Sequence, residues 1–149
     1  MTIREILKNP GNQGKKAVAI YADMDNLKIV NDEFGHDEGD FSIKTIANVL
    51  SKTLRGSDVV GRMGGDEFAA FAIINQDSYS DKIKDRIQNA MKEFNDQCDK
   101  PYYVNISIGT YEFIIDDTVD IEQILTKADA ELYIEKKEKK RRISVYKSN

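Results

Sequence analysis

The chain has 149 residues, of which 40% are hydrophobic and 32% charged, with a net charge of −4 and a single cysteine, Cys98. This length fits one domain that buries its core without disulfides or a structural metal, and the negative charge argues against a nucleic-acid partner, which selects a basic face. No apolar run approaches the roughly 20 residues that cross a bilayer, so we expect no membrane contact and a cytoplasmic domain.

The first 16 residues are expected to form an N-terminal extension ahead of a domain that spans residues 17–149. Residues 2–8 predict a short helix. Residues 9–16 contain Pro, Asn and Gly and predict a turn-rich loop.

Residues 17–22 form a compact apolar run, which is typical of a strand buried on both faces. This run stops at Asp23. Residues 27–34 then predict a short helix that ends at Gly35 in a left-handed cap. The apolar residues between 38 and 54 recur at helical spacing and predict a longer helix.

Residues 58–62 and 67–74 predict two strands joined by the tight turn Gly64-Gly65-Asp66. The other expected elements are a helix at 79–98, a strand at 102–113, a helix at 121–135 and a closing strand at 143–146. The order βααββαβ with a closing strand predicts an α+β fold. Its centre is an antiparallel sheet flanked by helices, as in the ferredoxin-like or palm architecture.

Carboxylates stand at the ends of two expected strands. Asp23 ends the first strand with Asp25 close behind, and Asp66-Glu67 lies in the hairpin turn. If these strands are neighbours, the carboxylates come within reach of one Mg2+, which prefers a few carboxylate oxygens and substrate phosphates. Helix capping by Asp23 and a plain turn role for Asp66 explain the same spacing equally well.

Charge is unevenly distributed along the chain. Carboxylates concentrate between Asp23 and Asp40, whereas the segment from Lys136 to Arg142 is strongly basic. An acidic loop and a basic segment together could hold a metal–nucleotide complex, although most charge runs are solvated helix faces.

The run Gly64-Gly65-Asp66-Glu67-Phe68 resembles the signature of GGDEF domains, a family of diguanylate cyclases with a nucleotidyl-cyclase-like palm fold. Three further blocks resemble the family in the same order: Asp23 to Asp32 with Phe34-Gly35-His36 and Gly39-Asp40, then Ser107-Ile108-Gly109, then Ala128-Asp129 with Leu132-Tyr133 and Lys136. The resemblance covers residues 17–146.

The resemblance implies condensation of two GTP molecules into cyclic di-GMP and two pyrophosphates, with Mg2+ or Mn2+, between the two protomers of a homodimer. It implies metal ligands at Asp23, the Met24 carbonyl, Asp66 and Glu67, with Asp66 also the base for the 3'-hydroxyl. The implied nucleotide contacts are Asn31 and Asp40 at the guanine edge, His36 beside the nucleotide, Gly64 and Gly65 at the turn, and Lys28, Lys136 and Lys140 on phosphates.

The chemistry of Asp40 agrees with a guanine contact. A carboxylate can accept hydrogen bonds from both N1-H and the exocyclic amine of guanine, and adenine lacks this pair of donors. Without the resemblance, Asp40 is an ordinary residue near a helix N-terminus, Asn31 a loop former and His36 a packing residue.

A second, inhibitory site for cyclic di-GMP is implied by Arg55 and Asp58, an Arg-x-x-Asp pair ahead of the glycines, together with Arg86 on the following helix. Guanidinium groups bind phosphates or a guanine edge bidentately. Exposed Arg-Asp pairs are otherwise common.

The chain also departs from the family. Nothing in residues 1–16 resembles the stretch that usually precedes the first strand, so we expect a fragment of a larger protein. Residues 139–142 are Lys-Lys-Arg-Arg where Gly-Arg-Asn-Arg is typical. A module that binds GTP or cyclic di-GMP without turnover remains the competing hypothesis, although the intact carboxylates favour an enzyme. A plain protein-interaction domain is a third, weaker one.

Overall fold

The computed structural model describes residues 3–54, 59–62, 65–74, 79–139 and 146–147. Its centre is a four-stranded antiparallel sheet with the strand order β2-β3-β1-β4. The strands are β1 (Lys16–Met24), β2 (Val59–Arg62), β3 (Glu67–Ile74) and β4 (Ile106–Ile114).

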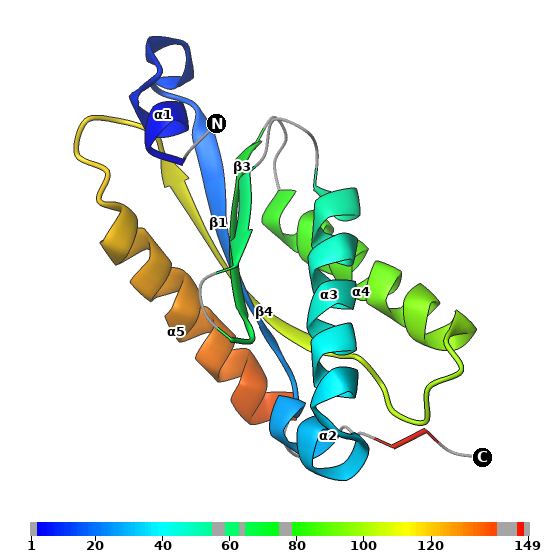
Figure 1. Ribbon diagram of the computed structural model, residues 1–149. Helices are drawn as coiled ribbons and strands as arrows, with labels where there is room; N and C mark the ends of the chain where they lie inside the picture. The colour runs from blue at the N-terminus through cyan, green and yellow to red at the C-terminus, as the bar shows by residue number, and fades with distance from the viewer. Residues whose placement is uncertain (1–2, 55–58, 63–64, 75–78, 140–145, 148–149) are drawn as a thin grey trace.

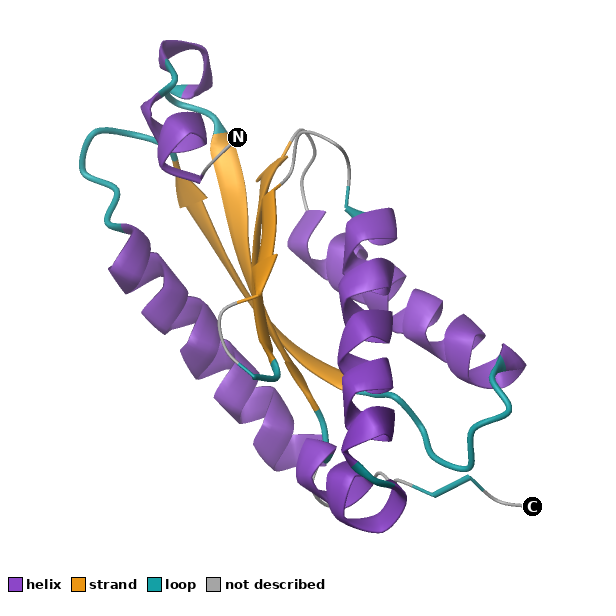
Figure 2. Cartoon of the chain, viewed as in Figure 1, coloured by secondary structure: helices purple, strands orange, loops and turns teal. Residues whose placement is uncertain are grey.

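Helices cover both faces of this sheet (Figure 1). They are α1 (Ile3–Lys8), the short 3-10 turn η1 (Pro10–Asn12), α2 (Leu27–Phe34), α3 (His36–Thr53), α4 (Tyr79–Gln97) and α5 (Ile121–Lys139). Figure 2 shows α3 and α4 on one side of the sheet and α5 on the other. The predicted α+β fold is confirmed, and so is the order βααββαβ from β1 to β4. None of the helices in the described part is both long and apolar enough to span a membrane.

The central strand β1 is buried on both faces, as its apolar run predicts. Val18, Ile20 and Met24 pack with α3 and α4, whereas Ala19 packs with α5 on the opposite face. This alternation follows from the two-residue period of a strand. It also places Tyr21 and Asp23 on the same face as Ala19, toward α5.

Helix α5 lies unusually close to β4 at Gly109. A Cβ atom at this position would lie 2.1 Å from the Ala128 carbonyl oxygen and 2.4 Å from the Leu132 nitrogen. A glycine is therefore required for the helix to rest on the strand backbone, and this contact fixes the distance of the middle of α5 from the sheet.

The N-terminal residues pack on the end of the sheet. Leu7 of α1 joins Ala17 and Ile115 in a small apolar cluster. The side chains of Asn12 and Gln13 donate to carbonyls of α1, to Ile6 at 2.9 Å and Leu7 at 2.8 Å.

Three local predictions are wrong. Gly35 has φ 99° and ψ 158°, which is not the left-handed cap, because α3 begins at the next residue and uses the Gly35 carbonyl to accept from Glu38 and Gly39. Strand β4 begins at Ile106 and not at 102, because the Asn95 side chain forms hydrogen bonds with both the N–H and the carbonyl of Val104, each at 2.9 Å. Helix α5 runs to Lys139, four residues beyond its predicted end.

The predicted closing strand at 143–146 falls mostly outside the described residues. Tyr146 forms an isolated antiparallel bridge with Tyr102.

Candidate active site

The pairing of β1 with β3 brings the predicted carboxylates together. Asp23 is the register partner of Glu67, and the Met24 N–H donates to the Asp66 carbonyl at 3.2 Å. Carboxylate oxygens of Asp23, Asp66 and Glu67 lie within 4.8 Å of one another, and all three residues are half-buried. We call these three residues the carboxylate cluster.

Asp23 has two very different oxygens. Its Oδ2 forms an ion pair with Lys136 Nζ at 3.0 Å, whereas its Oδ1 is buried and has no hydrogen-bond partner among the described residues. Burial, together with the adjacent carboxyl of Asp66, raises the pKa of Asp23 to about 7 against the opposing effect of Lys136. An unpartnered oxygen among like charges indicates a place for a cation, and an all-oxygen donor set suits Mg2+ or Mn2+.

Tyr21 orients one member of the cluster. Its hydroxyl donates to Glu67 Oε2 at 2.9 Å, and burial followed by this hydrogen bond raises the pKa of Tyr21 to about 12. The phenol therefore remains a donor at neutral pH. Sequence reasoning missed Tyr21, although its position two residues before Asp23 places it on the same face of β1.

Asp25 belongs to a separate network. Its Oδ1 accepts from Ser107 Oγ at 2.6 Å, and its Oδ2 pairs with Lys139 Nζ at 3.3 Å. The Asp25 N–H donates to the Asn105 carbonyl at 2.8 Å. Sequence reasoning gave no role to Ser107 or Lys139 in holding this turn, because both contacts depend on where β4 and α5 lie.

The acidic loop and the basic segment do meet. Lys136 of α5 reaches Asp23 and lies 3.5 Å from the Met24 carbonyl oxygen, while Lys139 reaches Asp25. In Figure 1 the end of α5 and α2 lie at the same end of the sheet, opposite α1.

The residues expected at the guanine edge come from α2 and α3. Asn31 is half-buried on α2, and a Cβ atom at Gly39 of α3 would lie only 1.8 Å from its Oδ1. Gly39 therefore lets Asn31 rest against the start of α3, beside the exposed Asp40. His36 is the exposed first residue of α3.

The remaining predicted contacts are less defined. Lys28 on α2 and Gly65 are exposed. Gly64, Lys140, Arg55 and Asp58 lie outside the described residues.

Arg86 of the expected inhibitory site is described. It is exposed on α4, and its Nη2 donates to the Thr53 carbonyl at the end of α3 at 3.4 Å.

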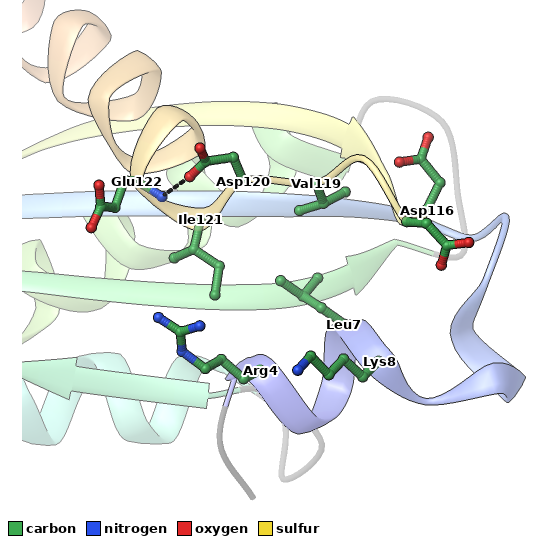
Figure 3. A pocket seen from close by; sticks show the side chains of 9 residues that line it. Arg4, Leu7, Lys8, Asp116, Val119, Asp120, Ile121 and Glu122 are labelled. Carbon is green, nitrogen blue, oxygen red and sulfur yellow. Dashed lines mark hydrogen bonds between the residues drawn. The ribbon is translucent and has the colours of Figure 1, made fainter.

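An open cleft of about 490 Å³ lies between α1 and the start of α5 (Figure 3). Its lining shares no residue with the carboxylate cluster. Two of its carboxylates already have structural roles, since Asp120 Oδ1 accepts from the Glu122 N–H at 3.0 Å and Asp116 Oδ1 from the Thr118 N–H at 2.8 Å. We therefore place the candidate active site at the carboxylate cluster.

The family model described as "Diguanylate cyclase, GGDEF domain" matches residues 2–142. The chain is 32% identical over 127 residues to diguanylate cyclase DgcP of Escherichia coli, covering 85% of this chain and 37% of that protein. It is 38% identical over 87 residues to the cyclic di-GMP phosphodiesterase NbdA of Pseudomonas aeruginosa, covering 58% of this chain and 11% of that protein. The chain thus spans well under half the length of these relatives.

Solved structures of two GGDEF proteins have the same fold as this chain. The diguanylate cyclase SiaD of Pseudomonas aeruginosa, in complex with its activator SiaC, matches with a TM-score of 0.78 at 28% identity, over 91% of this chain and 52% of that one. The GGDEF domain of PA1120 from the same organism matches with a TM-score of 0.73 at 28% identity, over 90% of this chain and 84% of that one.

Proposed function

The chain belongs to the GGDEF diguanylate cyclase family, and from this premise we propose that it condenses two GTP molecules into cyclic di-GMP and two pyrophosphates in the cytoplasm. The observation that carries the proposal is the carboxylate cluster with the unpartnered Oδ1 of Asp23.

Asp23, Asp66, Glu67 and the Met24 carbonyl would hold Mg2+ or Mn2+, which when bound supplies positive charge against the phosphates and lowers the pKa of the attacking hydroxyl. Tyr21 holds Glu67 in place through its hydroxyl. Lys136, already at the cluster, would bind phosphate, as would Lys28 and Lys140.

Each 3'-hydroxyl attacks the α-phosphate of the other GTP. A new bond forms between the 3'-oxygen and the α-phosphorus. The bond between the α-phosphorus and the oxygen bridging to the β-phosphate breaks, and pyrophosphate leaves with that oxygen. The hydroxyl proton passes to Asp66 as base. Repeating this step with the roles exchanged closes the ring. Positioning of the two reactants accounts for much of the rate of such transfers.

Asn31, Asp40 and His36 would select guanine, because Asp40 can accept from N1-H and the exocyclic amine. The proximity of Asn31 to α3 at Gly39 supports a shared pocket for the base.

One site holds one GTP, so catalysis requires a homodimer whose two sites face each other. Binding of cyclic di-GMP at Arg55, Asp58 and Arg86 would inhibit the enzyme.

The test is incubation of concentrated protein with GTP and Mg2+, with cyclic di-GMP and pyrophosphate measured together. We expect product from the wild type, none from Asp66→Ala, and unchanged product from Asp96→Ala, an exposed carboxylate on α4. Retained GTP binding without product at every protein concentration would contradict the enzyme and leave a nucleotide-binding module.

A further inference from the structure

Four charged side chains form a continuous ionic chain beside β4, the edge strand of the described sheet. Lys84 of α4 pairs with Glu135 Oε2 of α5, Lys139 Nζ lies 3.4 Å from Glu135 Oε1, and Lys139 Nζ lies 3.3 Å from Asp25 Oδ2. Side-chain exposure is 38% at Lys84, 14% at Glu135, 23% at Lys139 and 10% at Asp25. The most buried charge is therefore the one next to the carboxylate cluster in sequence.

Among the described residues, Lys139 already contacts three partners. An ammonium group offers three hydrogen-bond donors. Lys139 donates to Asp25 Oδ2 and to the carbonyl oxygen of Ile106 on the edge strand β4, and it also forms the ion pair with Glu135. Gln88 Nε2 of α4 shares that carbonyl at 3.1 Å.

These contacts fix the peptide unit between Met24 and Asp25. The Asp25 N–H is bound to Asn105 of the segment before β4, and the Asp25 carboxylate is held by Ser107 and Lys139. Because the C=O and N–H of a trans peptide point in opposite directions, the Met24 carbonyl points away from Asn105. Lys136 Nζ lies 3.5 Å from that carbonyl oxygen and 3.0 Å from Asp23, so the carbonyl and the carboxylate share one cation neighbour.

We propose that Lys139 is a positioning residue: by holding Asp25 against β4, it keeps the Met24 carbonyl directed at the metal site. It acts through the turn and does not touch the nucleotide. This inference rests on the proposed function in taking the Met24 carbonyl as a metal ligand.

The test measures Mn2+ binding to the 149-residue chain by electron paramagnetic resonance, without nucleotide. We expect Lys139→Met to raise the dissociation constant roughly tenfold, the lower end of the effect of removing a residue that orients a ligand. Lys137→Met removes an exposed lysine from the same helix and should leave it unchanged.

Adding Asp25→Asn to Lys139→Met should restore most of the affinity, because the neutral amide still accepts from Ser107 and no longer leaves a buried charge unpaired. If Lys139→Met does not fold by circular dichroism, Lys139→Gln takes its place, since it keeps a donor for Ile106.

Unchanged or tighter Mn2+ binding overturns the inference, because loss of a nearby positive charge by itself favours a cation. Failure of Asp25→Asn to restore binding also overturns it. Weaker Mn2+ binding by Lys139→Met in a chain that makes no cyclic di-GMP would keep this inference and refute the proposed function. If the wild type makes cyclic di-GMP and Lys139→Met binds Mn2+ as the wild type does, the proposed function is kept and this inference is refuted.

Discussion

The carboxyl group of Asp23 makes the metal-free protein sensitive to pH. Its pKa is raised to about 7, so the neutral form stabilises the fold below the ordinary pKa near 4, and this contribution is lost as pH rises through about 7. Without metal, we expect Asp23→Asn to become progressively more stable than the wild type between about pH 4 and 8. Each kcal/mol of difference in the free energy of unfolding should raise its melting temperature by about 2–4 °C.

Thermal melts in a chelator across this pH range check the prediction. Saturating Mg2+ should reverse the order at pH 8, because the wild type gains a bound ion that the variant holds poorly. If the difference in melting temperature between the two proteins is the same at every pH, the pKa of Asp23 is not raised.

Asp40 should determine the choice of base. Replacing it by Asn removes the charged acceptor for two guanine donors, and hydrogen bonds to charged groups contribute about 1.5–3 kcal/mol. We expect GTP affinity to fall roughly 10- to 100-fold by calorimetry, with ATP binding little changed. Asp37→Asn, an exposed carboxylate of the same helix, is the matched control. Equal losses from both variants would assign the effect to overall charge.

The carboxylates of the candidate site could be predicted from the sequence, but not the residues that orient them. Asp23 and Asp66 stand at expected strand ends, so their proximity required only that the two strands be neighbours. Tyr21, Ser107 and Lys139 act through the register of β1 with β3 and β4 and through the position of α5, which no local pattern encodes.

At the scale of elements, Gly109 determines where α5 lies. We expect Gly109→Ala to destabilise the fold by about 1–3 kcal/mol, because the new Cβ meets backbone that cannot move aside without shifting the helix. Chemical denaturation measures this cost. Gly11→Ala is the control, since its nearest neighbour is an exposed Asn9 side chain at 3.3 Å.

Displacement of α5 should also withdraw Lys136 from Asp23. We therefore expect the variant to bind GTP more weakly even at temperatures where it is folded. Full stability in Gly109→Ala would mean that α5 can move without cost.

The order of elements could be predicted because each has a local cause: a doubly buried apolar run for β1, paired glycines for the hairpin, and helical spacing for α3 and α4. The boundaries that were wrong have distant causes. The side chain of Asn95 delays the start of β4, and contacts of Lys136 and Lys139 extend α5.

At the scale of the whole molecule, the proposed reaction needs two copies of the chain. When the protein is largely monomeric, doubling its concentration should raise the initial rate of cyclic di-GMP formation about fourfold, by mass action. Initial rates are compared with sedimentation at the same concentrations. A rate proportional to concentration in a sample that sediments as a monomer would contradict reaction between two protomers.

The central strand β1 is hydrogen-bonded to a neighbour along both edges, and its middle residues are almost fully buried. Such amides exchange with solvent mainly through global unfolding, whereas a short terminal helix such as α1 opens far more easily. Asp23 and Met24 are therefore attached to the part of the molecule that opens last. Partial unfolding of α1 would therefore leave the turn that follows Asp23 and Met24 intact.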